Sequence, residues 1–156
     1  MYRKSIIIGI QGTQLTNEER YLIKTKKPWG VILFSRNIKD IFQLKNLIKD
    51  IRNVIKDKNY PILVDQEGGR VSRLNKIIDL SLFSQGYFGK LYKSDKNFFN
   101  HCYKIYIEKV SDIIKKVGIN INIVPVLDVE RNQGHKIIGN RSFSKDPAIV
   151  SEIGNL

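Results

Sequence analysis

The stretch GVILFSRNIKDIFQLKNLIKDIRNVI (Gly30–Ile55) decides the fold class, because a continuous apolar run is followed in it by apolar residues at helical spacing. Its first part, GVILFS (Gly30–Ser35), is nearly all apolar, as in a parallel strand that is buried on both faces. After Asp40, which can cap a helix, the apolar residues recur with the spacing of one helical face. They are Ile41, Leu44, Leu47, Ile48, Ile51, Val54 and Ile55. The stretch therefore predicts a strand followed by a helix.

The same succession of apolar run, turn and helical pattern recurs along the chain. The other predicted strands are SIIIGI (Ser5–Ile10), PILVD (Pro61–Asp65) and INIVPVLDV (Ile121–Val129). The other predicted helices begin after the capping box Thr16–Glu19, span about Asp95 to Val117, and begin at Asp146-Pro147. Strands that alternate with helices indicate an α/β fold of about four parallel βα units.

Two architectures fit four such units: an open doubly wound sheet and part of a (β/α)8 barrel. The length of 156 residues suits one domain. The helical stripe that begins after Pro147 includes Ile149, Val150 and Ile153 and is still in progress at Leu156. We therefore interpret the chain as truncated in its fourth predicted helix.

The composition narrows the classes of function. The net charge is +12, but the lysines and arginines are scattered over the polar positions of the helical patterns, so we expect no nucleic-acid partner. The one cysteine, Cys102, allows no intramolecular disulfide and lies at an apolar helical position. We find neither a signal-peptide pattern nor a run long enough to span a membrane, and expect a cytoplasmic protein without a membrane partner.

Polar groups follow several of the predicted strands. They are Ser35-Arg36-Asn37, the segment Asp65–Arg70, Asp128 and, a short loop further on, Arg141. Functional groups of parallel α/β folds collect at the carboxyl ends of strands. We therefore expect these side chains on one rim of the sheet.

The sequence VDQEGGR after the third predicted strand allows two interpretations. A carboxylate at a strand end can accept hydrogen bonds from adjacent hydroxyls of a sugar ring, and the glycines allow a sharp turn and close approach of a ligand. Alternatively, Asp65 or Glu67 pairs with Arg70 or Arg73 and only fastens the loop. The residues alone leave both interpretations open.

Other chemistries are not indicated. No phosphate-binding glycine loop or Gly-x-Ser-x-Gly elbow is present, and His101 and His135 do not have the spacing of metal ligands. We interpret His101 as a structural helix residue and His135 as a solvated loop residue. No metal or organic cofactor is expected.

Four motifs together resemble a known family. GVILFSRN (30–37), VDQEGGRVSRL (64–74), VPVLDV (124–129) and IGNRSF (138–143) occur in the order found in the N-terminal half of bacterial β-N-acetylhexosaminidases of glycoside hydrolase family 3. The resemblance extends over essentially the whole chain. It implies the N-terminal half of a (β/α)8 TIM barrel, in an enzyme that removes N-acetylglucosamine from peptidoglycan-derived saccharides with retention of configuration.

The resemblance also implies roles for particular residues. Asp65 would hold ring hydroxyls of the sugar, while Arg73 and Arg141 would line and orient it. Asp128 and Arg70 would support the same rim. The family's catalytic histidine follows a KHFPGHG-like stretch and its nucleophilic aspartate comes late in the barrel; neither is found in this sequence, so no catalytic residue is assigned.

The leading hypothesis is thus a hexosaminidase half that binds the sugar but is inactive alone. The alternatives are a non-catalytic sugar-binding module or decayed product, and a half-barrel that needs a partner chain. The oligomeric state and the rest of the substrate are not predicted.

Overall fold

The computed structural model describes residues 2–131 and 136–156, which form two compact units. The first unit holds the residues up to Asp65 together with Arg73–Ile78 and Asp112–Asn122. The second unit holds Gln66–Ser72, Asp79–Ser111 and the described residues from Ile123 onward. The two units are described separately below as unit 1 and unit 2.

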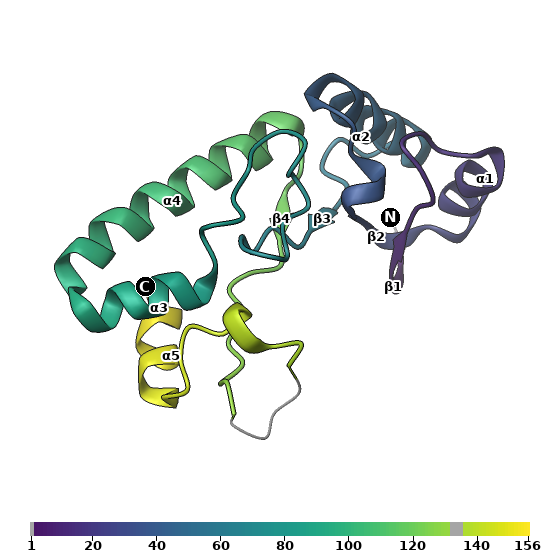
Figure 1. Cartoon of the computed structure of the whole chain (residues 1–156). Helices are drawn as coiled ribbons and strands as arrows, with labels where there is room; N and C mark the ends of the chain where they lie inside the picture. Colours follow the sequence, from purple (N-terminus) through teal and green to yellow (C-terminus); the bar gives the residue numbers. More distant parts are fainter. Residues whose placement is uncertain (1, 132–135) are drawn as a thin grey trace. The chain divides into compact units, whose positions relative to one another are not determined.

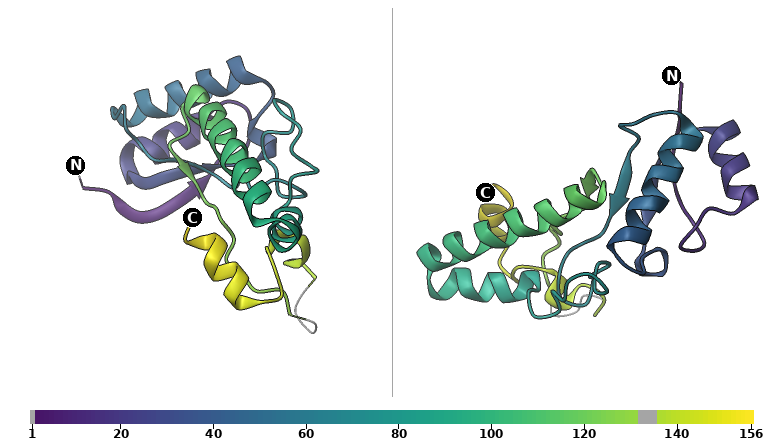
Figure 2. Two further views of the ribbon diagram at one scale, coloured as in Figure 1. Left: turned by 90° about the vertical axis from the view of Figure 1, so that its left-hand side faces the viewer. Right: turned by 90° about the horizontal axis from the view of Figure 1, so that it is seen from above.

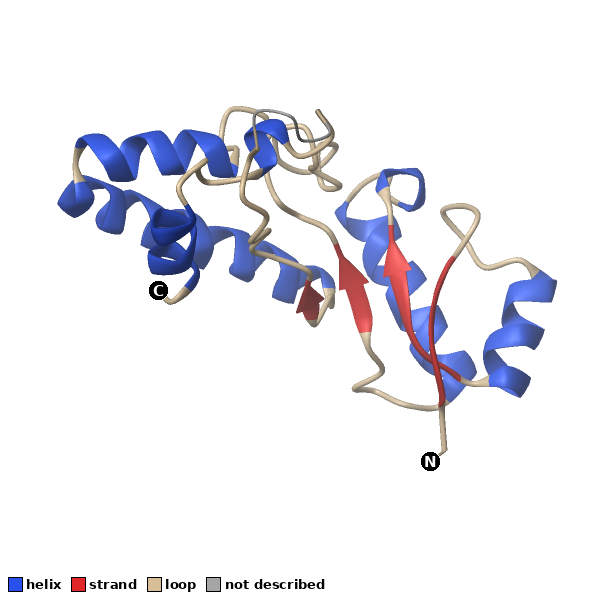
Figure 3. Ribbon diagram, turned by 90° about the horizontal axis from the view of Figure 1, so that it is seen from below, coloured by secondary structure: helices blue, strands red, loops and turns tan. Residues whose placement is uncertain are grey.

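Unit 1 is built on a parallel sheet, whose strands are drawn in red in Figure 3. Over the described residues the sheet has four strands in the order β1-β2-β3-β4. Their bounds are Lys4–Gly9, Pro28–Leu33, Ile62–Val64 and Ile121–Asn122. Every neighbouring pair is parallel, which confirms the α/β prediction.

Helices α1 and α2 of unit 1 pack beside each other (Figure 1). Helix α1 spans Asn17–Lys26 and begins with the predicted capping box, in which Thr16 and Glu19 bond each other's backbone amides. Helix α2 spans Ile41–Ile55, and the Asp40 carboxylate caps it by accepting from the amide of Gln43. A 3-10 turn, η1 (Ser35–Asn37), separates β2 from α2. The predicted strand–turn–helix order of this segment is confirmed.

The apolar face of α2 forms the core of unit 1 together with β2 and β3. The buried side chains of α2 are Leu44, Leu47, Ile48, Ile51 and Ile55, all of them on the predicted face. Ile41, which was assigned to the same face, is 41% exposed because it lies at the first turn of the helix. The buried strand residues Val31, Leu33, Ile62 and Val64 complete this core.

The edges of the sheet are β1 and β4, as expected for a sheet that is not closed. Strand β1 is the more exposed: Ile6 and Ile7 expose 53% and 43% of their surface. Its predicted strand character is confirmed, with bounds of Lys4–Gly9 in place of Ser5–Ile10. Among the described residues, no helix has the length and apolarity required to cross a bilayer.

Unit 2 is helical. Helix α3 (Gln85–Ser94) runs into α4 (Lys96–Val117), whose last turns belong to unit 1, and α5 (Pro147–Gly154) packs against them (Figure 2). The short 3-10 turn η2 spans Gly139–Arg141. The core consists of aromatic rings from α3, from α4 and from the segment that follows η2, together with aliphatic side chains from α5. Its buried members are Phe88, Tyr92, Phe99, Phe143, Val150 and Ile153.

Helix α3 was not predicted, because its sequence QGYFGKLYKS contains two glycines, which lower helix propensity. The structure shows why they are present. A Cβ added to Gly89 would lie 1.7 Å from the carbonyl oxygen of Phe143, and one added to Gly86 would lie 3.2 Å from Asn140. The segment 139–143 therefore lies directly against the backbone of α3, and this packing stabilises a helix of modest intrinsic propensity.

The fourth predicted strand is much shorter than expected. Strand β4 includes only Ile121 and Asn122, and the rest of the predicted run Ile121–Val129 is irregular. Pro125 has no N–H to donate to a ladder. The backbone of Val126 pairs instead with a side chain: its N–H donates to Oε1 of Gln85 and its carbonyl accepts from Nε2, both at 2.8 Å.

Replacement of Gly89 tests this packing. Gly89→Ala is expected to lower the free energy of unfolding by about 2 kcal/mol or more, because the methyl group overlaps the Phe143 carbonyl. At an unobstructed helical position the same change stabilises by up to about 1 kcal/mol. Denaturant unfolding measures the difference. Gly12→Ala is the control, since a Cβ at Gly12 meets nothing within 4 Å; equal stability of Gly89→Ala and wild type would contradict the close approach.

Candidate functional site

The carboxyl end of β3 in unit 1 carries Asp65, the principal predicted ligand of a sugar. Within the described residues, its carboxylate accepts one side-chain hydrogen bond, from Nη2 of Arg73 at 3.4 Å. That distance is long for a charge-assisted bond, which is normally near 2.8 Å. Both side chains remain about a quarter exposed, at 23% for Asp65 and 25% for Arg73. The carboxylate therefore retains acceptor positions for a ligand.

Two guanidinium groups lie over one aromatic ring at the neighbouring strand end. Phe34 directly follows β2, and its ring centroid is 4.6 Å from Cζ of Arg36 and 5.6 Å from Cζ of Arg73. The face of an aromatic ring attracts cations, so Phe34 helps to hold Arg73 beside Asp65. Sequence reasoning missed this role of Phe34. The available signal was an aromatic residue at the end of an apolar run, two residues before an arginine.

A buried asparagine ties the first two strand ends together. Asn37 is fully buried, and its Nδ2 donates to the carbonyl oxygens of Ile10 and Gly12 at 3.1 and 2.8 Å. Its Oδ1 accepts from the amide of Phe34 at 2.9 Å. Arg36 adds a bond from Nε to the same Ile10 carbonyl at 3.0 Å. The predicted cluster Ser35-Arg36-Asn37 thus fixes the backbone around the strand ends.

The loop Gln66–Ser72 belongs to unit 2 and is folded into a tight turn. Gly68 and Gly69 both have positive φ, and a Cβ at Gly68 would lie 2.2 Å from the carbonyl oxygen of Phe83. The turn is closed by a 2.8 Å hydrogen bond from Nε2 of Gln66 to Oγ of Ser72. The two glycines are therefore required by the backbone conformation and by the closeness of Phe83.

Glu67, in this loop, forms the best-defined ion pair of unit 2. Its side chain is 5% exposed, and Arg141 binds both of its oxygens through Nε and Nη2, each at 2.9 Å. The hydroxyl of Tyr106 donates to the Glu67 carbonyl. Burial raises the pKa of Tyr106 to about 12, so this hydroxyl keeps its proton at neutral pH. Glu67 and Arg141 thus hold the loop to the turn η2.

The structure shows which carboxylate of the VDQEGGR loop pairs with which arginine. A contact between Asp65 and Arg73 exists, as the loop-fastening interpretation proposed. Glu67 pairs with neither Arg70 nor Arg73 but with Arg141, which corrects that part of the interpretation. The correct partner was outside the range of local reasoning, because it lies 74 positions along the chain.

The supporting residues have different roles. Arg70 donates to the carbonyl oxygens of Lys136, Ile137 and Ile138 and so holds the chain before η2. The exposed Asp128 does not follow a strand end, because β4 stops at Asn122. Its backbone carbonyl accepts a hydrogen bond from Oγ of Ser142.

The two histidines were predicted to be structural or solvated residues. His101 lies on the exposed surface of α4, and the prediction for His135 falls outside the described residues. Among the residues that the structure describes, no group of three or more His, Cys, Asp or Glu side chains is placed to hold a metal ion.

The arrangement can be compared with known proteins. Residues 5–156 match the model of the glycosyl hydrolase family 3 N-terminal domain. The chain belongs to glycosyl hydrolase family 3.

Two relatives of the chain are both beta-hexosaminidases. The chain is 32% identical to a beta-hexosaminidase of Xanthomonas campestris pv. campestris over 154 residues, which is 94% of this chain and 43% of the relative. It is 34% identical to a beta-hexosaminidase of Tolumonas auensis, over 96% of this chain and 42% of the relative. The family 3 chain thus spans about two-fifths of the length of these relatives.

A solved structure confirms the fold. The crystal structure of NagZ from Neisseria gonorrhoeae in complex with N-trifluoroacetyl-D-glucosamine superposes with a TM-score of 0.84 at 29% identity. The match covers 97% of this chain and 45% of the NagZ chain. The fold is therefore that of the N-terminal TIM-barrel domain of family 3 enzymes, and the prediction of a barrel segment over an open doubly wound sheet is confirmed.

The assignment of Asp65, Arg73 and Arg141 as sugar ligands stays a prediction. The structure places Asp65 beside Arg73 in unit 1, and Arg141 beside Glu67 in unit 2. Nε and Nη2 of Arg141 donate to Glu67, and Nη1 donates to the carbonyl oxygen of Ile137 at 3.4 Å.

The two ion pairs are expected to differ in strength. In double-mutant cycles with alanine, Glu67 and Arg141 should show a coupling energy of about 2–3 kcal/mol, because removal of one partner leaves the other charge uncompensated in a largely buried position. Asp65 and Arg73 should show less than about 1 kcal/mol, because their contact is long and partly exposed. Unfolding by denaturant gives both values. Similar coupling energies for the two pairs would contradict the geometry described above.

Proposed function

We propose that this chain supplies the N-acetylglucosamine-binding groups of a β-N-acetylhexosaminidase. The observation that carries the proposal is the partly exposed Asp65 carboxylate at the carboxyl end of β3, to which Arg73 makes a long contact of 3.4 Å. Membership of family 3 and the similarity to beta-hexosaminidases support the class of substrate.

The proposed binding chemistry follows from the donors and acceptors. An ionised carboxylate accepts only, and two adjacent sugar hydroxyls can donate to its two oxygens. Arg73 has donors only and can bind a further oxygen of the sugar while its guanidinium lies over Phe34. By the family resemblance Arg141 also binds the sugar, and Glu67 fixes the orientation of its guanidinium.

The finer features of the reaction are part of the proposal. Retention of configuration needs a nucleophile and an acid/base group on the two sides of the glycosidic bond. By the family resemblance, neither group is among residues 1–156. The peptidoglycan-derived substrate and the cytoplasmic location likewise remain predictions.

Sugar binding by Asp65 can be measured on the 156-residue chain. We expect N-acetylglucosamine to shift amide resonances around Asp65 in an NMR titration, and Asp65→Asn to weaken binding at least about tenfold, since it removes a charged acceptor. Asp112→Asn, an equal change of charge at an exposed position of α4, should leave the affinity unchanged. Equal affinity of Asp65→Asn and wild type would refute the role of Asp65.

Turnover provides a separate test. The 156-residue chain is expected to release no chromophore from a chromogenic N-acetylglucosaminide, because the resemblance assigns it no nucleophile or acid/base residue. Discontinuous assays over many hours, with a family 3 hexosaminidase as positive control, set the limit of detection. Release that disappears in Asp65→Asn would show that residues 1–156 contain catalytic groups and would overturn this part of the proposal.

A further inference from the structure

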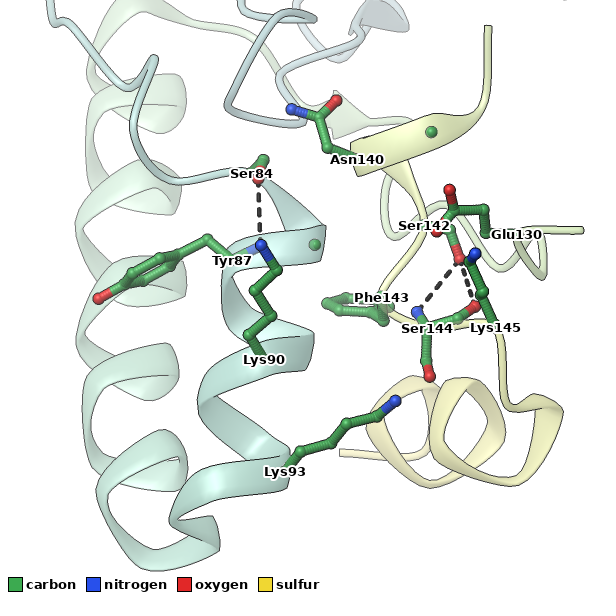
Figure 4. A pocket seen from close by; sticks show the side chains of 12 residues that line it. Ser84, Tyr87, Lys90, Lys93, Glu130, Asn140, Ser142, Phe143, Ser144 and Lys145 are labelled. Atoms are coloured by element: carbon green, nitrogen blue, oxygen red, sulfur yellow. Dashed lines mark hydrogen bonds between the residues drawn. The ribbon is translucent and has the colours of Figure 1, made fainter. Parts of the chain in front are cut away.

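A pocket lies wholly within unit 2. It is lined by residues other than those discussed as sugar ligands. It has a volume of about 540 Å³, within the range of small-molecule sites. Helix α3 forms one wall and the segment from Gly139 to Lys145 forms the other, with Glu130 beside it (Figure 4). All of these elements belong to one compact unit, so the pocket is a feature of that unit alone.

The walls are held together by contacts that leave little freedom. Gly86 and Gly89 allow the second wall to lie directly on the backbone of α3. Oγ of the buried Ser142 accepts from the amide of Ser144 at 3.2 Å, and its single proton is shared between the carbonyl oxygens of Asp128 at 2.6 Å and Ser144 at 2.8 Å. The amide of Glu130 donates to the carbonyl of Ser144. The pocket is therefore preformed.

The charge of the lining is unbalanced. Among the described residues that line it are three lysines, Lys90, Lys93 and Lys145, and one carboxylate, Glu130. Lys90 and Lys93 are three positions apart on α3 and therefore lie on the same side of the helix. In the described part of the chain, neither of the two forms an ion pair. Their flexible side chains can therefore turn toward a bound anion, which would compensate both charges.

The rest of the lining suits a ligand with hydroxyl groups. Half-buried Glu130 is an acceptor for hydroxyl donors, and Asn140 supplies an amide. The ring of Phe143 is also part of the lining, but it is only 3% exposed and belongs to the core of unit 2. A bare inorganic anion would meet the lysines but would also face the Glu130 carboxylate without offering it a donor.

We propose that this pocket binds a small anionic sugar, whose phosphate or carboxylate lies against Lys90 and Lys93 and whose hydroxyls donate to Glu130. The proposal does not depend on the hexosaminidase function, because it uses a different set of residues. It also gives a local purpose to part of the strong positive charge of the chain.

Titration of the 156-residue chain with three probes tests the proposal. Glucose 6-phosphate and glucuronate should bind, with affinities that fall as salt is added, and neutral glucose should bind at least about tenfold more weakly. Binding of only one of the two acids would support the site and identify its anion as phosphate or carboxylate. Binding of glucose as tight as that of both acids would overturn the proposal.

Paired variants locate the site. The double variant Lys90→Gln/Lys93→Gln should weaken binding of the acidic sugars about tenfold, and Lys45→Gln/Lys49→Gln, with the same charge change on exposed positions of α2, should not. Equal losses in the two double variants would show attraction by net charge alone and refute the pocket. Asp65→Asn should leave binding of the acidic sugars unchanged, which separates this test from that of the hexosaminidase proposal.

Discussion

A carboxylate that is almost removed from water has to be neutralised, and in this chain Arg141 does so for Glu67 through two 2.9 Å hydrogen bonds. The pair joins the VDQEGG and IGNRSF segments, which are far apart in the sequence. On one side it fixes a loop whose glycines have little space around them; on the other it fixes the short turn that borders the lysine-lined pocket. Much of the local order of unit 2 therefore depends on one charge being matched.

The two predicted sugar-binding arginines are held by different means. Arg73 has a long contact with Asp65 and lies over the ring of Phe34, so its surroundings attract a cation without prescribing one orientation. Arg141 is bound at two points to a fixed carboxylate, which prescribes the plane of the guanidinium. A carboxylate with acceptor capacity beside an adaptable arginine suits hydroxyl binding, whereas a rigid arginine suits orientation.

The alternation of strands and helices was predictable, because Gly30–Ile55 has a continuous apolar run followed by a 3.6-residue period. Helix α3 was not, since its glycines lower local propensity and its stability comes from contact with Phe143 and Asn140. The fourth strand was predicted too long for a related reason. Its apolar residues indicated pairing with a neighbouring strand, but the backbone of Val126 pairs with the side-chain amide of Gln85. Asp65 and Arg73 could be located from the motif, but the Glu67–Arg141 pair and the Phe34 ring depend on the tertiary fold.

The bonds between Gln85 and Val126 have a consequence for association with other chains. A side-chain amide presents the same donor and acceptor as a peptide group, so Gln85 satisfies this stretch of backbone in the way a neighbouring strand would. The side chain has one amide group, so it can satisfy the backbone of one residue only. The peptide groups of Val126 that bond Gln85 are therefore not available for pairing with the backbone of another polypeptide.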